Sequence, residues 1–93
     1  MTQEVWKFTL DMSEKSTRID APLGAKFISV QRQGAGVVAW AIVDPSFPID
    51  PVTVERHGTG WPIREPADGL CRTYIATIVD GAFVWHFFRL GCL

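Results

Sequence analysis

The sequence lacks the features that define several classes of protein. It holds no apolar run long enough for a membrane-spanning helix, no internal repeat, and no segment with the period of an amphipathic helix. Residues 1–10 alternate polar and apolar side chains without the apolar core of a signal peptide. We therefore expect no membrane contact, and no helix beyond a single turn near residues 11–14.

Cysteine and histidine are also scarce. The two cysteines, Cys71 and Cys92, do not stand in a C-x-x-C spacing, and the chain has two histidines. A zinc site needs three or four such ligands, so no metal site and no cofactor are predicted. Two lone thiols in a chain without a signal peptide indicate reduced, cytosolic cysteines.

An excess of one charge is absent as well. Nine lysines and arginines stand against ten aspartates and glutamates, which gives a net charge of −1. Proteins that bind nucleic acid without sequence preference usually carry a basic excess, so non-specific nucleic-acid binding is not expected. A local basic patch is still compatible with this balance.

Aromatic residues, by contrast, are abundant. Four tryptophans and six phenylalanines occur in 93 residues, a length that predicts a single β domain over residues 1–93. Two interpretations stay open. Either some of this aromatic area is held for a partner, or the chain has an aromatic-rich β core with no further meaning, since aromatic residues are common in strands.

Short segments of alternating or β-branched residues are separated by glycine- and proline-rich turns. This spacing predicts an all-β fold, a compact antiparallel β-sandwich or partly open barrel of about six to seven short strands. Residues 26–32 and 37–43 should pair as a hairpin around residues 33–36. The earlier strands are expected at residues 4–10, 18–21, 26–32, 37–43 and 52–57.

The last quarter of the chain, residues 71–89, predicts a second hairpin. Its two runs meet at Asp80-Gly81, a dipeptide typical of two-residue type I′ turns. This centre places Arg72 opposite Arg89, where like charges repel unless an anion lies between them or the strand ends fray. The other predicted pairs are Ile78 with Phe83, Ala76 with Trp85, Tyr74 with Phe87, Thr77 with Val84, Ile75 with His86, and Thr73 with Phe88. The face that carries Ile75, Val84 and Phe88 is apolar enough to favour a homo-oligomer.

No pattern of residues indicates an enzyme, because no nucleophile motif is present and the carboxylates fall around loops. Several residues are candidates for binding. The backbone N–H groups of Gly58, Thr59 and Gly60 could hold a phosphate, with a plain turn as the alternative. The remaining candidates are Trp61 and Phe47 as loop anchors, Arg72 and Arg89 as anion contacts, and His86, which is otherwise a partly buried strand residue.

Several pieces of the sequence, taken in order, resemble a known pattern. They are Trp40-Ala41-x-Val43-Asp44-Pro45, Gly58-Thr59-Gly60-x-Pro62-Ile63, Tyr74-Ile75-x-Thr77 and Phe83-Val84-Trp85-His86-x-Phe88. Together with the opening Val5-Trp6-Lys7-Phe8-x-Leu10, they resemble an uncharacterised family of small proteins encoded by phages and prophages. The resemblance implies a phage accessory protein in the cytoplasm of the host bacterium, and such proteins often counter host defence.

Three hypotheses follow. The first is a non-enzymatic, anti-CRISPR-like protein that inhibits a bacterial defence system by stoichiometric binding to a host effector, with loop aromatics as interface anchors. The second is a homo-oligomeric sponge for a nucleotide immune signal, with phosphate on residues 58–60, Arg72 and Arg89, and a base stacked on Trp61. The third is a minor virion or assembly protein that needs only self-association.

Overall fold

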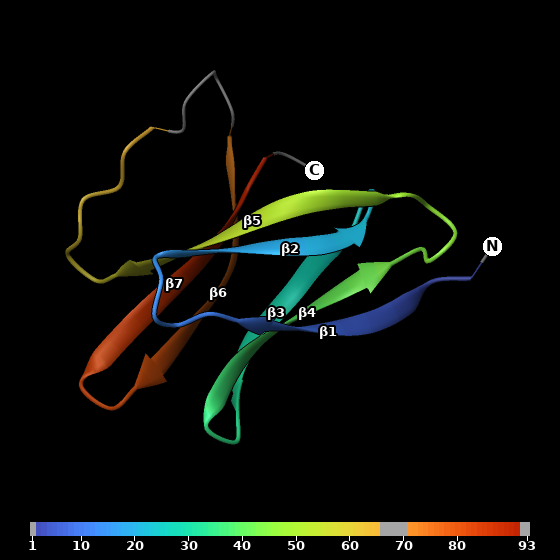
Figure 1. Ribbon diagram of the computed structural model, residues 1–93. Coiled ribbons are helices and arrows are strands. Elements are labelled where there is room, and N and C mark those ends of the chain that lie inside the picture. Colours follow the sequence, from blue (N-terminus) through green and yellow to red (C-terminus); the bar gives the residue numbers. More distant parts are fainter. Residues whose placement is uncertain (1, 66–70, 92–93) are drawn as a thin grey trace.

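The structure, a computed structural model, describes residues 2–65 and 71–91, and over these residues the chain is all-β (Figure 1). The predicted fold class is confirmed, with seven strands in two antiparallel sheets. The predicted helical turn is a single hydrogen-bonded turn, in which Glu14 N donates to Asp11 O over 3.2 Å. The strands are β1 (Glu4–Leu10), β2 (Ser16–Pro22), β3 (Lys26–Gln33), β4 (Gly36–Val43), β5 (Ile49–Gly58), β6 (Arg72–Asp80) and β7 (Phe83–Leu90).

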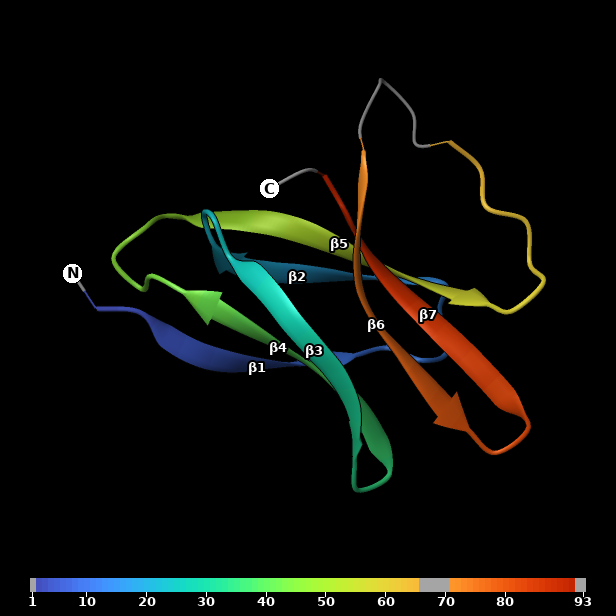
Figure 2. The same cartoon turned by 180° about the vertical axis from the view of Figure 1, so that it is seen from behind.

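The first sheet has the order β1-β4-β3, and the predicted β3–β4 hairpin is confirmed. The second sheet has the order β2-β5-β7-β6. The chain changes sheet between β1 and β2, between β2 and β3, and again between β4 and β5. At one side of the molecule β3, an edge strand of the first sheet, lies next to β6, an edge strand of the second (Figure 2).

The core lies between the two sheets, because alternate side chains of each strand point inward. On β7, Trp85 and Phe87 are buried while Val84, His86 and Phe88 on the other face are only partly covered. The buried side chains of the core are Leu10, Ile19, Ala21, Ala25, Phe27, Val30, Val37, Ala39, Ala41, Val43, Val52, Val54, Trp85 and Phe87.

The strand β5 begins earlier than the alternation predicts, at Ile49 rather than Val52. Pro51 lies within it, opposite Asp20 of the edge strand β2. The pairing of β5 with β7 starts only at Val54. A proline, which cannot donate a ladder hydrogen bond, is tolerated here because the strand has a neighbour on one side alone.

The turn of the terminal hairpin is not where the Asp80-Gly81 dipeptide predicts. Asp80 pairs with Phe83, so the two turn residues are Gly81 and Ala82, and Gly81 has φ of 60°. Glycine at the first of two turn positions is typical of a type II′ turn. The predicted pairs are therefore wrong, and the observed ones are Val79 with Val84, Ile78 with Trp85, Thr77 with His86, Ala76 with Phe87, Tyr74 with Phe88, Thr73 with Arg89, and Arg72 with Leu90.

A β-bulge between Tyr74 and Ala76 changes which residues share a face. Shifting a two-residue turn by one position moves each pairing by two residues, which leaves every side chain on its predicted face. The extra residue of the bulge, Ile75, then reverses the faces for the rest of β6. The predicted encounter of Arg72 with Arg89 is thus wrong, because the two side chains lie on opposite faces of the sheet.

Cys71 is disulfide-bonded, so the expectation that it is a reduced thiol is also wrong. Cys92 lies outside the described residues. Within residues 2–65 and 71–91 there is no helix long and apolar enough to cross a membrane.

Candidate binding pocket

A pocket of about 760 Å³ lies beside the end of β5, where the chain leaves the second sheet. Its walls come from four parts of the chain: the turn before β2, the strand β5, the loop that follows β5, and the open end of the β6–β7 hairpin. The lining residues are Lys15, Ser16, Glu55, Arg56, His57, Trp61, Pro62, Arg64, Glu65, Arg72 and Leu90.

Trp61 is placed by a tight turn that begins at Gly58. Trp61 N donates to Gly58 O over 3.0 Å, and Gly60 within this turn has φ of 87°, a backbone conformation that favours glycine. A Cβ atom added at Gly58 would lie only 2.8 Å from Trp61 Cε2, so the indole occupies the space of the missing side chain. The ring also packs edge-on against Trp85, with centroids 5.3 Å apart, and it remains 42% exposed.

Two cations lie against the Trp61 ring. Lys15 Nζ is 5.8 Å from its centroid, and the guanidinium of Arg56 is 5.7 Å from it. Arg56 also lies 4.3 Å from the ring centroid of Trp85, and its Nη2 donates to Glu14 O over 3.1 Å. These contacts fix the guanidinium at the pocket wall without neutralising its charge.

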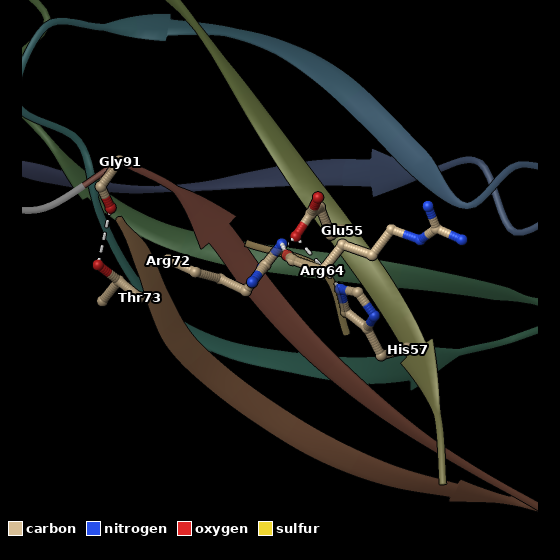
Figure 3. Close-up of polar contacts among 6 residues, drawn as sticks. All are labelled: Glu55, His57, Arg64, Arg72, Thr73 and Gly91. Atoms are coloured by element: carbon tan, nitrogen blue, oxygen red, sulfur yellow. Dashed lines mark hydrogen bonds and ion pairs between the residues drawn. The ribbon is translucent and has the colours of Figure 1, made fainter. Parts of the chain in front are cut away.

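A second polar group of the pocket forms around Glu55. Arg72 Nε donates to Glu55 Oε1 over 2.6 Å, and His57 Nε2 lies 3.2 Å from the same oxygen (Figure 3). Arg72 also donates from Nη2 to Arg64 O over 2.8 Å, which ties the loop after β5 to the start of β6. Burial acts to raise the pKa of Glu55, but the hydrogen bonds from Arg72 and His57 outweigh it and hold that pKa below its usual value.

The pocket consequently carries more positive than negative charge. Its wall holds four lysine and arginine side chains and two carboxylates, and Glu55 is already paired with Arg72. Among residues 2–65 and 71–91, no ion pair involves Lys15, Arg56 or Arg64. An anionic group could therefore be held by three cations without an ion-pair partner beside an exposed indole ring.

His86 lies outside this pocket and links strands instead. Its Nε2 is 2.8 Å from Thr59 Oγ1, and its Nδ1 is 3.0 Å from Thr77 Oγ1. Tyr74 extends the chain of contacts, because its hydroxyl lies 2.7 Å from the same Thr77 oxygen. His86 is paired with Thr77 rather than with Ile75, and both ring nitrogens have hydrogen-bond partners.

The structure brings together only part of the predicted site. Trp61 and Arg72 line the pocket, and Gly58 lies in contact with the indole of Trp61. Thr59 and Gly60 belong to the same turn but do not line the pocket, and Thr59 N already donates to Val84 O over 3.2 Å, which fits the plain-turn interpretation. Phe47 lies in the β4–β5 connection, at the opposite end of β5, and Arg89 lies on the core face of β7.

Sequence reasoning missed Lys15, Arg56, Arg64, Glu55 and His57 as pocket residues. Alternation along residues 52–57 separates Arg56 from its neighbours Glu55 and His57, but it does not show that a pocket opens beside this end of the strand. Lys15 has no local signal, because only the pairing of β2 with β5 brings it near Arg56. Arg56 N donates to Lys15 O over 2.9 Å, which records this approach.

Comparison with known proteins assigns the chain to one family. The model of a domain of unknown function, DUF7352, matches residues 1–91, and the chain therefore belongs to that family. No curated protein and no solved structure matches it.

Proposed function

We propose that this member of the DUF7352 family is a non-enzymatic binding protein whose pocket sequesters a ligand that combines a phosphate with a flat ring, a nucleotide being the simplest case. The observation that carries the proposal is the exposed Trp61 ring with Lys15 and Arg56 each within 6 Å of its centroid, in a pocket that Arg64 also lines. Nucleobases stack on aromatic side chains, and phosphates bind arginine and lysine. A pocket of about 760 Å³ is within the range of small-molecule sites.

The hydrogen bonds of Glu55 and His57, the acid and base groups of the pocket, favour binding without turnover. Glu55, the carboxylate closest to His57, is held by Arg72, and no hydroxyl or thiol is hydrogen-bonded to His57 in the described part of the chain. A nucleophile with an adjacent general base would be required for covalent catalysis. The proposal therefore retains the nucleotide sponge of the sequence hypotheses.

The setting of this activity rests on the resemblance to phage- and prophage-encoded proteins. A phage protein that removes a nucleotide immune signal in the cytoplasm of its host would act against bacterial defence. The disulfide at Cys71 does not favour that compartment, because cytosolic thiols usually stay reduced. Alkylating thiols in intact cells before lysis tests the setting: labelled Cys71 agrees with the cytoplasm, and a fully protected Cys71 contradicts it.

Titration of the protein with nucleoside monophosphates, diphosphates and cyclic dinucleotides, followed by tryptophan fluorescence and calorimetry, tests the function. We expect saturable binding that Lys15→Met and Arg64→Met each weaken by roughly tenfold, because each removes a charge-assisted contact. Arg18→Met is the matched control, since Arg18 is an exposed arginine paired with Asp20 away from the pocket. Mass spectrometry should recover the nucleotide unchanged.

The proposal fails if no nucleotide binds, or if the two pocket variants bind as the wild type does. Conversion of the nucleotide would contradict the non-enzymatic part alone. Inorganic phosphate that binds as tightly as every nucleotide would show that the Trp61 ring takes no part.

A second function, inhibition of a host effector by direct contact, is favoured by a different observation. Three large apolar side chains of the β6–β7 hairpin are exposed, Tyr74 at 56%, Val79 at 69% and Phe83 at 61%. Exposed aromatic and aliphatic side chains of this kind are typical anchors of protein interfaces. A pull-down with the wild type and with Val79→Lys distinguishes the two: loss of one specific host protein would support the inhibitor.

A further inference from the structure

A smaller cavity of about 290 Å³ opens between β3 and β6, where the edges of the two sheets meet. It is separate from the pocket beside β5, because the two cavities share no lining residue. Its lining residues are Lys26, Phe27, Thr73, Tyr74, Ile75 and Arg89. Tyr74 and Lys26 are exposed, so the cavity is reached from solvent along the gap between the two edge strands.

Arg89 is the unusual member of this cavity. Its side chain is on the core face of β7, and the residue is only 9% exposed. A buried charge is ordinarily paired with an opposite charge, because removing it from water without compensation costs several kcal/mol. Within residues 2–65 and 71–91, however, Arg89 forms no ion pair.

The hydrogen bonds of Arg89 are also incomplete. Nη1 donates to the carbonyl oxygen of Ala25, which ties β7 to the segment before β3, and the guanidinium lies 6.0 Å from the ring centroid of Phe27. Nε is buried and has no hydrogen-bond partner among the described residues. Burial lowers the pKa of Arg89, and the charge of Asp50 partly offsets that effect without forming an ion pair with it.

A structural role for Arg89 explains the contact to Ala25 but leaves the Nε donor unexplained. A hydrophobic side chain of similar length at position 89 would be buried at a lower desolvation cost than the charged guanidinium. The planar guanidinium fork matches a carboxylate with two parallel hydrogen bonds, and Lys26 at the rim supplies a second positive charge. The remaining walls, Phe27 and Ile75, suit an apolar body attached to the acid.

We infer that the cavity between β3 and β6 binds a small organic acid, with its carboxylate on Arg89 and its apolar body against Phe27 and Ile75. A monoanion is favoured over a phosphate dianion because the cavity holds a single buried cation. This site is independent of the pocket that carries the proposed function, so either can fail alone.

The experiment is a titration with benzoate and hexanoate at constant ionic strength, followed by calorimetry and by the NMR signal of the Arg89 Nε–H group. We expect saturable binding of at least one acid and a shift of that signal. Both are measured on the wild-type protein, so this part of the test does not depend on a variant that folds. Arg89→Met should weaken binding by roughly tenfold or more, since a charge-assisted contact is lost. Arg18→Met, at an exposed arginine that lines neither cavity, is the matched control and should bind the acid as the wild type does.

Arg89→Lys separates the fork geometry from the charge, and it should bind the acid more weakly than the wild type although the charge is retained. The inference is overturned if the Nε–H signal stays fixed at saturating acid, or if chloride or inorganic phosphate moves it equally. It is also overturned if folded Arg89→Met, checked by circular dichroism, binds the acid with unchanged affinity.

Discussion

At the scale of the single residue, the close approach of Trp61 to Gly58 decides the shape of the pocket. A methyl group at position 58 would lie within 3.0 Å of three atoms of the indole. Gly58→Ala should therefore destabilise the protein by about 1–3 kcal/mol, the usual cost of forcing extra volume into a packed site. It should also weaken ligand binding, because the Trp61 ring has to move.

The control for this prediction is the same substitution in a Trp61→Ala background, where the clash no longer exists. Urea unfolding of the four proteins gives the coupling between the two positions. If Gly58→Ala costs the same with and without the indole, the effect belongs to the backbone rather than to the contact. Gly60→Ala should cost stability in both backgrounds, because its φ of 87° disfavours any side chain.

Glu55 gives the protein a pH dependence with a definite sign. Its folded-state pKa is below the usual value of 4.5, because the hydrogen bonds from Arg72 and His57 outweigh the effect of burial. At a pH between the folded-state pKa of Glu55 and 4.5, the unfolded chain binds more protons than the folded one. The contribution of Glu55 to the free energy of unfolding is therefore complete above about pH 4.5, and it is lost as the pH falls through the folded-state pKa.

Glu55→Gln should remove that part of the dependence. Unfolding by urea at a series of pH values from neutral to about pH 3 should give a shallower loss of stability for the variant than for the wild type. Asp11, whose pKa is lowered by the hydrogen bonds from Ser13, is present in both proteins and cancels in the comparison. Equal slopes for the two proteins would contradict the role assigned to Arg72 and His57.

Sequence reasoning at this scale found Trp61 and Arg72 because an exposed loop tryptophan and a cation at a strand end are visible in the sequence. It paired Arg72 with Arg89 wrongly, because the bulge between Tyr74 and Ala76 moves Arg72 to the other face of β6 while Arg89 keeps the core face of β7. No residue type near the bulge indicates the inserted residue.

At the scale of the element, the terminal hairpin shows why the turn was predicted one residue early. Asp-Gly is the commonest signal of a type I′ turn, but here Asp80 stays in the ladder opposite Phe83. In that position its carboxylate forms an ion pair with Arg32 of β3. The contact connects the edges of the two sheets, and a local dipeptide preference cannot reveal such a long-range partner.

The observed turn makes Gly81 the position that needs glycine. Gly81→Ala should cost roughly 1–2 kcal/mol, since its φ of 60° is unfavourable for a residue with a Cβ atom. Gly81→Asn should cost less, because asparagine tolerates this region. Thermal unfolding of both variants is the measurement, and equal losses would argue against a left-handed backbone at position 81.

At the scale of the whole molecule, the fold class followed from strand spacing because alternation, prolines and glycines are local signals. The apolar surface was less accurately placed. Of the residues predicted to be exposed, Ile75 packs against the core and Val84 and Phe88 are half-buried, whereas Tyr74, Val79 and Phe83 are exposed. The predicted self-association surface is therefore moved to Tyr74 and Val79, on the outer face of the edge strand β6.

Self-association through this surface remains a prediction. Light scattering at micromolar concentration should give at least twice the chain mass of 10.4 kDa, and Val79→Lys should return it to the monomer value. Val5→Lys is the matched control, because Val5 is similarly exposed on β1 of the other sheet. A monodisperse wild-type monomer would contradict the prediction.

The position of β7 in the strand order has a consequence for biosynthesis. β7 is the last of the seven described strands in chain order, yet it lies between β5 and β6, and it supplies Trp85 and Phe87 to the interior. In a nascent polypeptide that lacks β7, the strands β5 and β6 have no strand between them to pair with, and the inner face of the second sheet is left uncovered. The second sheet can then form only after residues 83–90 have left the ribosome, and a fragment truncated before β7 is expected to aggregate.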